Sequence, residues 1–314
     1  MKRIAWLTSL ASAVLLFVAG AAAASVAPSD SLITLTAQNC LFPACGPDLE
    51  RIEAFTPQGS LISTVHTSSP SDMLRIASDR FGNLLGAGAT LVKVNDDGSL
   101  TTLSVPLSEI GSISADQNGN VYVGQAHITK ISPSGQIVAT YMPNAPRAFS
   151  IDLSADQCTM YFTDGGAPTV YRFNVCQGVA LPPLTTALPN GGPADLRVLP
   201  SGQILVADGN AGVVVVDSIS GAIARTYPVP TQSLALSQDG TSFWAGKISV
   251  QRIDLQTGAI LATVTFNRAG NGLNSLAVVG EPRAAFATAI PTESGYALAL
   301  FIVTLAMVAL RRLS

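Results

Sequence analysis

Short runs of β-branched and aliphatic residues alternate with glycine-containing turns along most of the chain, most clearly between Asp195 and Tyr227. Each turn in this stretch supplies a residue that tolerates positive φ. A single four-stranded antiparallel sheet leaves both faces short of packing partners, so further copies are expected. The four predicted strands are Leu196–Leu199, Ile204–Ala207, Val213–Asp217 and Ala222–Tyr227.

Five further partial copies of this unit occur in the chain. Their last turns contain a glycine that recurs every 37 to 43 residues, and a period near 40 with four strands per unit is the mark of a β-propeller. The aligned glycines are Gly59, Gly98, Gly135, Gly178, Gly221 and Gly258. The copies of the second strand are Leu32–Ala37, Asn83–Gly88, Asn120–Gly124, Thr159–Asp164 and Ser242–Gly246.

The two ends of the repeat array match each other. The first unit begins at Leu32 without a first strand, whereas the last first-strand copy, Leu276–Val279, has no unit of its own. We therefore expect the C-terminal run to complete the N-terminal blade and close the ring, which removes open sheet edges. The prediction is an all-β, six-bladed propeller of four-stranded blades, forming one domain over residues 25–289. A seven-bladed ring or a pair of β-sandwiches is the alternative.

The repeated runs Gly-x-Ile/Val-x-Val-x-Asp and the hairpins of the type Val-x-Arg/Lys-Phe/Ile-Asp/Asn/Ser…Gly resemble those of NHL and gluconolactonase-like propellers. The resemblance spans most of Ser31–Gly280. It implies the same fold, but the functions of these families are too varied to transfer.

The N-terminus has the order of a secretory signal peptide. Met-Lys-Arg precedes an apolar run from Ile4 to Gly20, and small residues at Ala22 and Ala24 suit signal peptidase. We expect residues 1–24 to be removed, so that the mature protein begins near Ser25. A buried N-terminal helix or a retained membrane anchor is the alternative.

The C-terminus carries a second apolar run, Tyr296–Leu310, followed by Arg311 and Arg312. A helix of this length rises roughly 22 Å, short of a hydrocarbon core about 30 Å thick unless neighbouring residues or membrane thinning help. The arginines favour a cytoplasmic C-terminus, with the preceding body outside.

Residues 290–314 resemble the IPTL-CTERM class of bacterial sorting tails, which are related to PEP-CTERM tails. The match lies at Ile290, Pro291, Thr292 and Ser294, and the chain departs from the pattern at Glu293, Tyr296 and Ala297. The resemblance implies a Gram-negative bacterium and recognition by an exosortase-like membrane enzyme, with the helix in the inner membrane beforehand. A plain tail anchor is the alternative.

Four cysteines in an exported chain invite pairing. Cys158 and Cys176 flank a predicted hairpin with its turn midway between them, so their side chains are expected to face each other. Cys40 and Cys45 are close enough in sequence to close a small ring. Metal ligation or reactive thiols are the alternatives, although these spacings match no familiar zinc pattern.

Polar residues near the predicted inner strands could gather at the channel mouth of the ring, where propellers bind their ligands. The gluconolactonase-like resemblance implies a divalent cation held there by carboxylates and an asparagine, and such a cation needs oxygen ligands converging from several blades. The candidates are Asp116, Asp152, Asp195 and Asp208, with Asp72, Asp239 and Asn274 further possibilities. Bonds to turn backbones are the competing explanation for these aspartates.

No other motif points to catalysis. His66 is expected in a solvated Ser/Pro loop and His127 at a strand edge, and neither has a triad signature nearby. The second-strand aromatics Tyr122, Phe162 and Trp244 are expected in the core rather than on a sugar-stacking surface. A net charge of −3 provides no basic surface for nucleic acid.

Two functional hypotheses follow. The first is an exported, envelope-associated and monomeric propeller that acts as a binding or structural scaffold, is sorted through its tail, needs no cofactor and binds a surface ligand that the sequence does not identify. The second is a metal-dependent hydrolase or lyase of the gluconolactonase or streptogramin-lyase class, which would require a divalent cation.

Overall fold

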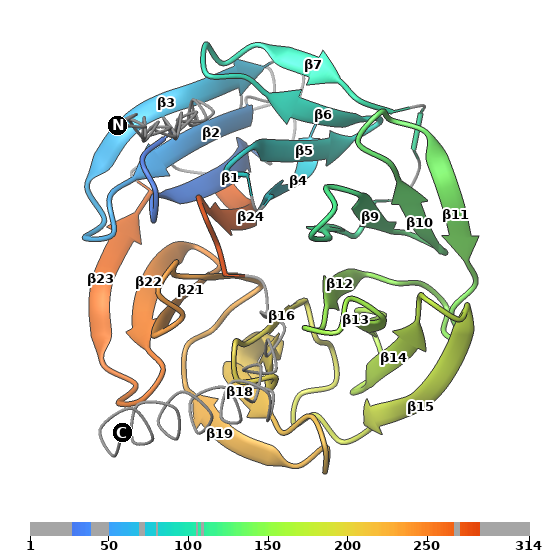
Figure 1. Cartoon of the computed structure of the whole chain (residues 1–314). Helices are drawn as coiled ribbons and strands as arrows, with labels where there is room; N and C mark the ends of the chain where they lie inside the picture. The colour runs from blue at the N-terminus through green and yellow to red at the C-terminus, as the bar shows by residue number, and fades with distance from the viewer. Residues whose placement is uncertain are drawn as a thin grey trace, which may run out of the picture.

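Six four-stranded antiparallel sheets are arranged as blades around a central axis (Figure 1). The computed structural model describes residues 27–38, 50–68, 73–79, 81–104, 106–107, 110–266 and 271–282. The predicted all-β, six-bladed propeller is therefore confirmed, and the alternatives of seven blades or paired sandwiches are wrong.

The blades follow one another in chain order, each running from the axis outward. Blade 1 contains β24 (Asn271–Val278), β1 (Leu32–Gln38), β2 (Glu50–Phe55) and β3 (Leu61–Ser68). Blade 2 contains β4 (Met73–Ser78), β5 (Leu84–Gly88), β6 (Leu91–Val94) and β7 (Leu100–Thr102). Blade 3 contains β8 (Ser112–Ala115), β9 (Val121–Gly124), β10 (Ile128–Ile131) and β11 (Ile137–Tyr141).

Blade 4 contains β12 (Ser150–Leu153), β13 (Thr159–Thr163), β14 (Val170–Asn174) and β15 (Val179–Thr185). Blade 5 contains β16 (Asp195–Val198), β17 (Ile204–Ala207), β18 (Val213–Val216) and β19 (Ile223–Tyr227), with the short 3-10 helix η1 (Gly209–Ala211) between β17 and β18. Blade 6 contains β20 (Ser233–Leu236), β21 (Ser242–Gly246), β22 (Ser249–Asp254) and β23 (Ile260–Thr265).

The ring closes as the end-matching predicts. β24 pairs antiparallel with β1, joining Leu32 to Val278 and Thr34 to Leu276, and a bulge follows Leu35. The C-terminal strand is thus the innermost strand of the N-terminal blade. This closure fixes the two ends of the repeat array to each other.

The glycines recur once per blade for two reasons, their backbone conformation and their packing against the neighbouring blade. All six occupy the left-handed region, and several lie against the outer strand of the preceding blade. A Cβ atom at Gly135 would lie 1.6 Å from the carbonyl oxygen of Leu103, whereas one at Gly178 would meet nothing within 4 Å. Glycine at such turns therefore permits both the turn and the close approach of neighbouring blades.

Aliphatic side chains fill each boundary between blades. Six buried clusters are present, one for each pair of adjacent blades. In the closing boundary, Trp244 of β21 packs with Leu32 of β1 and Leu276 of β24. Burial of each large aliphatic side chain stabilises the fold by roughly 1.5–3 kcal/mol, so these clusters are the main force holding the blades together.

The loops define two faces of the ring. We call the face where the innermost strands begin the upper face, and the opposite face, with the turns between first and second strands, the lower face. Both ends of the described body lie on the lower face, where Asp30 donates its N–H to the carbonyl of Val279 at 2.9 Å. The N–H of Val279 in turn donates to Ser31 at 3.0 Å.

Candidate functional site: the polar axis

The innermost strands place hydroxyl groups where adjacent blades meet. Ser150 of β12 accepts the N–H of Leu196 in β16 at 3.0 Å. Ser233 of β20 accepts the N–H of Leu276 in β24 at 3.0 Å. Both serines are buried, so each hydroxyl satisfies a backbone donor of the next blade that water does not reach.

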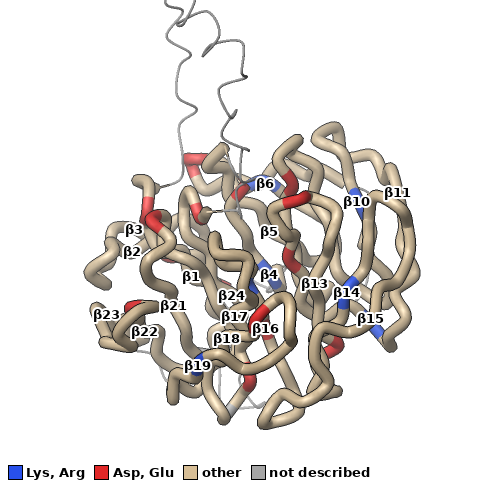
Figure 2. The backbone as a smooth tube through the Cα atoms, turned by 60° about the horizontal axis from the view of Figure 1, so that its bottom comes forward, with Lys and Arg blue, Asp and Glu red and all other residues tan. Residues whose placement is uncertain are grey.

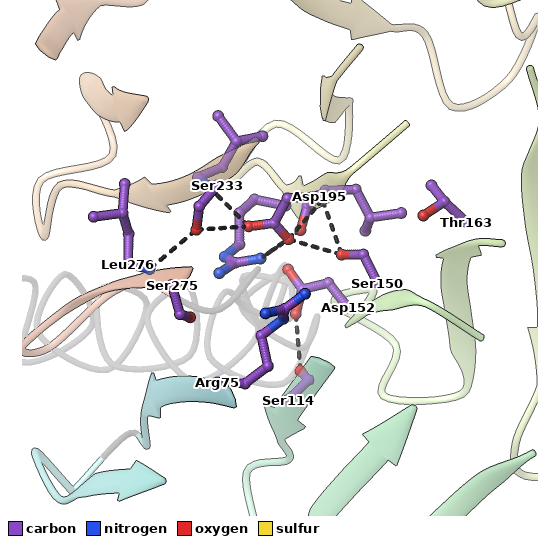
Figure 3. Close-up of polar contacts among 12 residues, drawn as sticks. Arg75, Ser114, Ser150, Asp152, Thr163, Asp195, Ser233, Ser275 and Leu276 are labelled. Atoms are coloured by element: carbon purple, nitrogen blue, oxygen red, sulfur yellow. Dashed lines mark hydrogen bonds and ion pairs between the residues drawn. The ribbon is translucent and has the colours of Figure 1, made fainter. Parts of the chain in front are cut away.

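Asp195 occupies the same strand position in blade 5 and makes stronger contacts (Figure 3). One carboxylate oxygen accepts the N–H of Leu234 in blade 6 at 2.8 Å. The other accepts the Ser150 hydroxyl at 2.7 Å and an N–H of the Arg197 guanidinium at 2.8 Å. A single carboxylate therefore links blades 4, 5 and 6.

Arg197 lies between two buried carboxylates. In addition to Asp195, its Nε donates to Glu281 at 3.2 Å, and Glu281 also accepts the N–H of Leu236 at 2.7 Å. Burial lowers the pKa of Arg197, but attraction to Asp195, Glu281 and Asp152 outweighs it, so the pKa is raised and the guanidinium stays charged. The result is a compensated ion cluster in a low-dielectric environment.

Asp152 completes the connection between blades 3, 4 and 5. It accepts the Ser114 hydroxyl at 2.9 Å and the N–H of Val198 at 2.9 Å. Like Asp195, it is buried and its carboxylate is used by groups from neighbouring blades. The sequence places both aspartates near the axis but gives no sign of these contacts.

Arg75 takes the equivalent position in blade 2 and points toward the same cluster (Figure 3). Its Nη1 donates to the carbonyls of Leu74 at 2.8 Å and Asn274 at 3.2 Å, and its Nε donates to the carbonyl of Gly111. Burial lowers the pKa of Arg75, Asp195 opposes this, and Arg197 adds to the lowering. Arg75 thus joins blade 2 to blades 1 and 3 through carbonyl oxygens.

The remaining candidate aspartates lie apart from this cluster. Asp116 accepts two turn N–H groups at 2.8 and 2.9 Å and pairs with Lys130 at 3.4 Å, and Asp239 accepts the N–H of Thr241 at 2.9 Å. Asp208 accepts the N–H of Asn190 at 2.8 Å, while its other oxygen is buried without a partner. Burial raises the pKa of Asp208 despite this bond.

These positions do not form the shared cation site that the resemblance implies. Asp116, Asp152, Asp195 and Asp208 are each bonded to different groups, and Asn274 contributes its carbonyl oxygen to Arg75. Within the described ranges, no group of three His, Cys, Asp or Glu side chains could hold a metal ion. The candidate carboxylates that the structure describes therefore do not fit a shared divalent cation, and Asp72 lies outside the described residues.

The predicted disulfide between Cys158 and Cys176 is present, with a Cα–Cα distance of 5.1 Å. Cys158 directly precedes β13 and Cys176 follows β14, so the bond joins two turns of blade 4 on the lower face. Cys40 and Cys45 lie outside the described residues, and their pairing stays a prediction.

The histidines and aromatics give mixed outcomes. His66 is wrongly predicted in a solvated loop: it lies half-buried in β3 with Nδ1 2.7 Å from the carbonyl oxygen of Gly98, because β3 extends to Ser68. His127 directly precedes β10, at the strand edge as expected. The predicted core aromatics Tyr122, Phe162 and Trp244 are fully buried.

The proposed targeting segments are outside the part of the chain that the structure describes. This applies to the signal segment 1–24 and to the tail with Ile290, Pro291, Thr292, Ser294, Arg311 and Arg312. Among the described residues, no helix has the length and apolar character needed to cross a bilayer. Along the described backbone, the Lys and Arg positions visible in Figure 2 are scattered over several strands.

Comparisons with solved structures define the class of the protein as a β-propeller. A protein of unknown function from Bacteroides caccae aligns with 81% of this chain and 100% of its own, with a TM-score of 0.61 and 14% identity. A chain of a nidogen/laminin complex aligns over 80% and 100%, with a TM-score of 0.60 and 12% identity. The WD40 β-propeller domain of Doa1 aligns over 72% and 80%, with a TM-score of 0.54 and 14% identity.

These identities support the fold alone. No family model and no curated protein matches the sequence. The similarity to NHL and gluconolactonase-like families therefore stays a prediction at the level of family.

Proposed function

We propose that this chain is an exported, envelope-associated β-propeller that acts as a binding or structural scaffold and is sorted through its C-terminal tail. The observation that carries the proposal is the use of the axial carboxylates. Asp152 and Asp195 bond backbone N–H groups of adjacent blades, so the chemistry at the axis serves to hold the ring together.

The disulfide supports the exported location. Such bonds persist in oxidising compartments and are rare in the cytosol, and the bond joins half-buried Cys158 to exposed Cys176, which cytosolic reductants would reach. The ends of the described body would also suit a tail anchor. A tether following Pro282 would leave from the lower face, so the upper face would point away from the membrane.

The test is fractionation of the native host combined with intact-mass measurement of the purified protein. We expect the protein in the envelope or medium, without residues 1–24, and either retaining the tail or cleaved near Ile290. Recovery from the cytosol alone would contradict the proposal. A tightly bound divalent ion together with lactonase or lyase turnover would instead support the metal-dependent enzyme.

A further inference from the structure

Two arginines meet one aromatic ring on the upper face of the ring. The guanidinium carbon of Arg75 lies 5.5 Å from the centroid of Phe149, and that of Arg147 lies 4.7 Å from the same centroid. Cation–π attraction favours each contact separately, but bringing two cations to one ring has a repulsive cost. An anion between or beside the guanidinium groups would offset that cost.

The local backbone is built around this cluster. Phe149 directly precedes β12, and its N–H donates to the carbonyl of Thr163 at 2.7 Å. A Cβ atom at Gly165 would lie 3.1 Å from the Phe149 ring and 3.2 Å from Nη2 of Arg147. A Cβ atom at Gly111 would lie 2.2 Å from the Phe149 carbonyl oxygen. Two glycines thus leave the space in which the cluster sits.

Neither guanidinium group is hydrogen-bonded to a carboxylate among the described residues, although the charge of Asp195 acts on Arg75. Their hydrogen bonds go to neutral carbonyl oxygens: Arg75 to Leu74, Gly111 and Asn274, and Arg147 through Nε to Asp164 at 2.9 Å. Across the described residues, neither arginine forms an ion pair with a carboxylate, whereas Arg197 forms two. Arg147 is exposed and Arg75 is half-buried, so both are within reach of a ligand.

We propose that Arg75, Arg147 and Phe149 form a binding site for an oxyanion-bearing ligand on the upper face. A guanidinium presents a planar fork of N–H donors that matches carboxylate and phosphate oxygens. This inference rests on the scaffold function proposed above. It adds the chemical class of the surface ligand. The upper face is also opposite the two ends of the described body, so a tether that follows Pro282 from the lower face would leave the site open.

The test measures binding to the full-length protein, purified in detergent, by isothermal titration at low ionic strength. The probes are glucuronate, inorganic phosphate and, as a neutral match for the first, glucose. We expect glucuronate or phosphate to bind, glucose to bind at least about tenfold more weakly, and added NaCl to weaken binding of the anions. Preference for glucuronate would indicate an acidic saccharide, and preference for phosphate a phosphate-bearing ligand.

Matched variants locate the site. Arg147→Gln should weaken anion binding by about tenfold or more, and Arg75→Gln should do the same. Arg172→Gln is the control, because Arg172 lies in β14 of blade 4 and, like Arg147, donates its Nε to a backbone carbonyl oxygen, that of Pro182 at 2.8 Å. Since Arg147 is exposed, its variant should keep the wild-type melting temperature even if Arg75→Gln fails to fold.

The inference is overturned if neither anion binds the wild-type protein, if glucose binds as tightly as glucuronate, or if Arg147→Gln binds like the wild type. An equal loss of anion binding in Arg172→Gln would show that binding depends only on the total positive charge of the protein, and would also overturn the inference. If the protein fractionates with the envelope but binds no anion, only the proposed binding site is contradicted. If the protein is recovered from the cytosol alone, the proposed function is contradicted, whatever the binding measurement shows.

Discussion

The blades are joined differently at the axis and at the periphery. At the axis, polar side chains such as Asp195 and Ser233 reach across to backbone N–H groups of the next blade. At the periphery, turn glycines such as Gly135 bring one blade's backbone against the outer strand of its neighbour. The axis therefore depends on the chemistry of particular side chains, whereas the periphery depends on the absence of a side chain.

Two kinds of side chain join the blades at the axis. The contacts among blades 4, 5 and 6 involve the charged groups Asp152, Asp195, Arg197 and Glu281. The N–H groups that join blade 6 to blade 1 and blade 1 to blade 2 donate to the hydroxyls of Ser233 and Ser275, although Glu281 and Arg75 add charged contacts there. Removing one member of a buried ion cluster leaves another uncompensated, while removing a hydroxyl leaves one N–H unsatisfied. The two kinds of contact should therefore differ in sensitivity to substitution.

The largest effect is expected from Asp195→Ala. The change removes the nearest carboxylate partner of Arg197 and the acceptor for Leu234 and Ser150, so we expect a loss of about 3–5 kcal/mol in the free energy of unfolding. Urea unfolding measures it, with the exposed turn variant Asp239→Ala as control. Equal stability of the two variants would show that the axial ions do not hold the blades.

Gly135→Ala tests the periphery. An added Cβ atom meets the Leu103 carbonyl oxygen at 1.6 Å, and alanine is also strained at a φ of 81°. Together these costs predict a loss of about 3 kcal/mol. Gly178→Ala has a similar φ of 71° and open space, so thermal unfolding of this control should show a smaller loss of about 1–2 kcal/mol. Similar losses in both variants would leave close blade packing without a role.

Replacing both Cys158 and Cys176 with Ser removes the covalent link between two lower-face turns of blade 4. For the sequence separation of 18 residues, we expect a loss of about 2–3 kcal/mol. Unfolding with and without reductant measures it. A wild-type protein that is unaffected by reductant, although mass spectrometry shows the bond broken, would contradict the expectation.

Ser233→Ala tests the hydroxyl contacts at the axis. It leaves the buried N–H of Leu276 without its acceptor and removes the 3.3 Å hydrogen bond from the Ser233 hydroxyl to Asp195, but the buried ion cluster keeps all its members, which predicts a loss of about 1–2 kcal/mol, clearly below that of Asp195→Ala. The exposed Ser63→Ala is the control in the same unfolding assay. If Ser233→Ala costs as much as Asp195→Ala, the distinction between the two kinds of contact fails.

Asp208→Asn should have the smallest effect on the free energy of unfolding and, unlike the variants above, should raise it. Burial raises the pKa of Asp208, so the folded protein binds its proton more tightly than the unfolded chain does. The free energy of unfolding therefore falls as pH rises through the folded-state pKa, and a neutral amide removes this contribution. We expect a small gain in stability at pH 7 and none at a pH where Asp208 is protonated. Melting temperatures of the variant and the wild type from acidic pH to pH 7 measure this difference. A lower melting temperature of the variant at pH 7 would contradict the prediction.

The sequence predicted the fold closely because its signals are local and repeated. Strand runs, turn glycines and the unmatched strand copies at the two ends led to six blades and to closure by Leu276–Val279, which the structure extends back to Asn271. The Cys158–Cys176 bond was also predictable, since both residues flank one hairpin. His66 was misplaced because the Ser/Pro composition after it obscured the end of β3.

The candidate site could be predicted only in part. The alignment of the innermost strands puts Ser150, Asp195, Ser233 and Arg75 at one position, which is a signal that could have identified the axial contacts. It could not show their partners, because Asp152 and Ser114 are 38 residues apart and Arg197 and Glu281 are 84 residues apart. It also gave no indication of the arginine pair around Phe149.

The sequence by itself determined the number of blades, the order of strands and the way the ring closes. These follow from alternation and turn chemistry within stretches of about 40 residues. Only the tertiary structure decided which groups of neighbouring blades the axial aspartates bond, and which arginines of the described residues lack a carboxylate partner. That outcome depends on groups from several blades, whose distances and orientations are set once closure and interblade packing fix the whole ring.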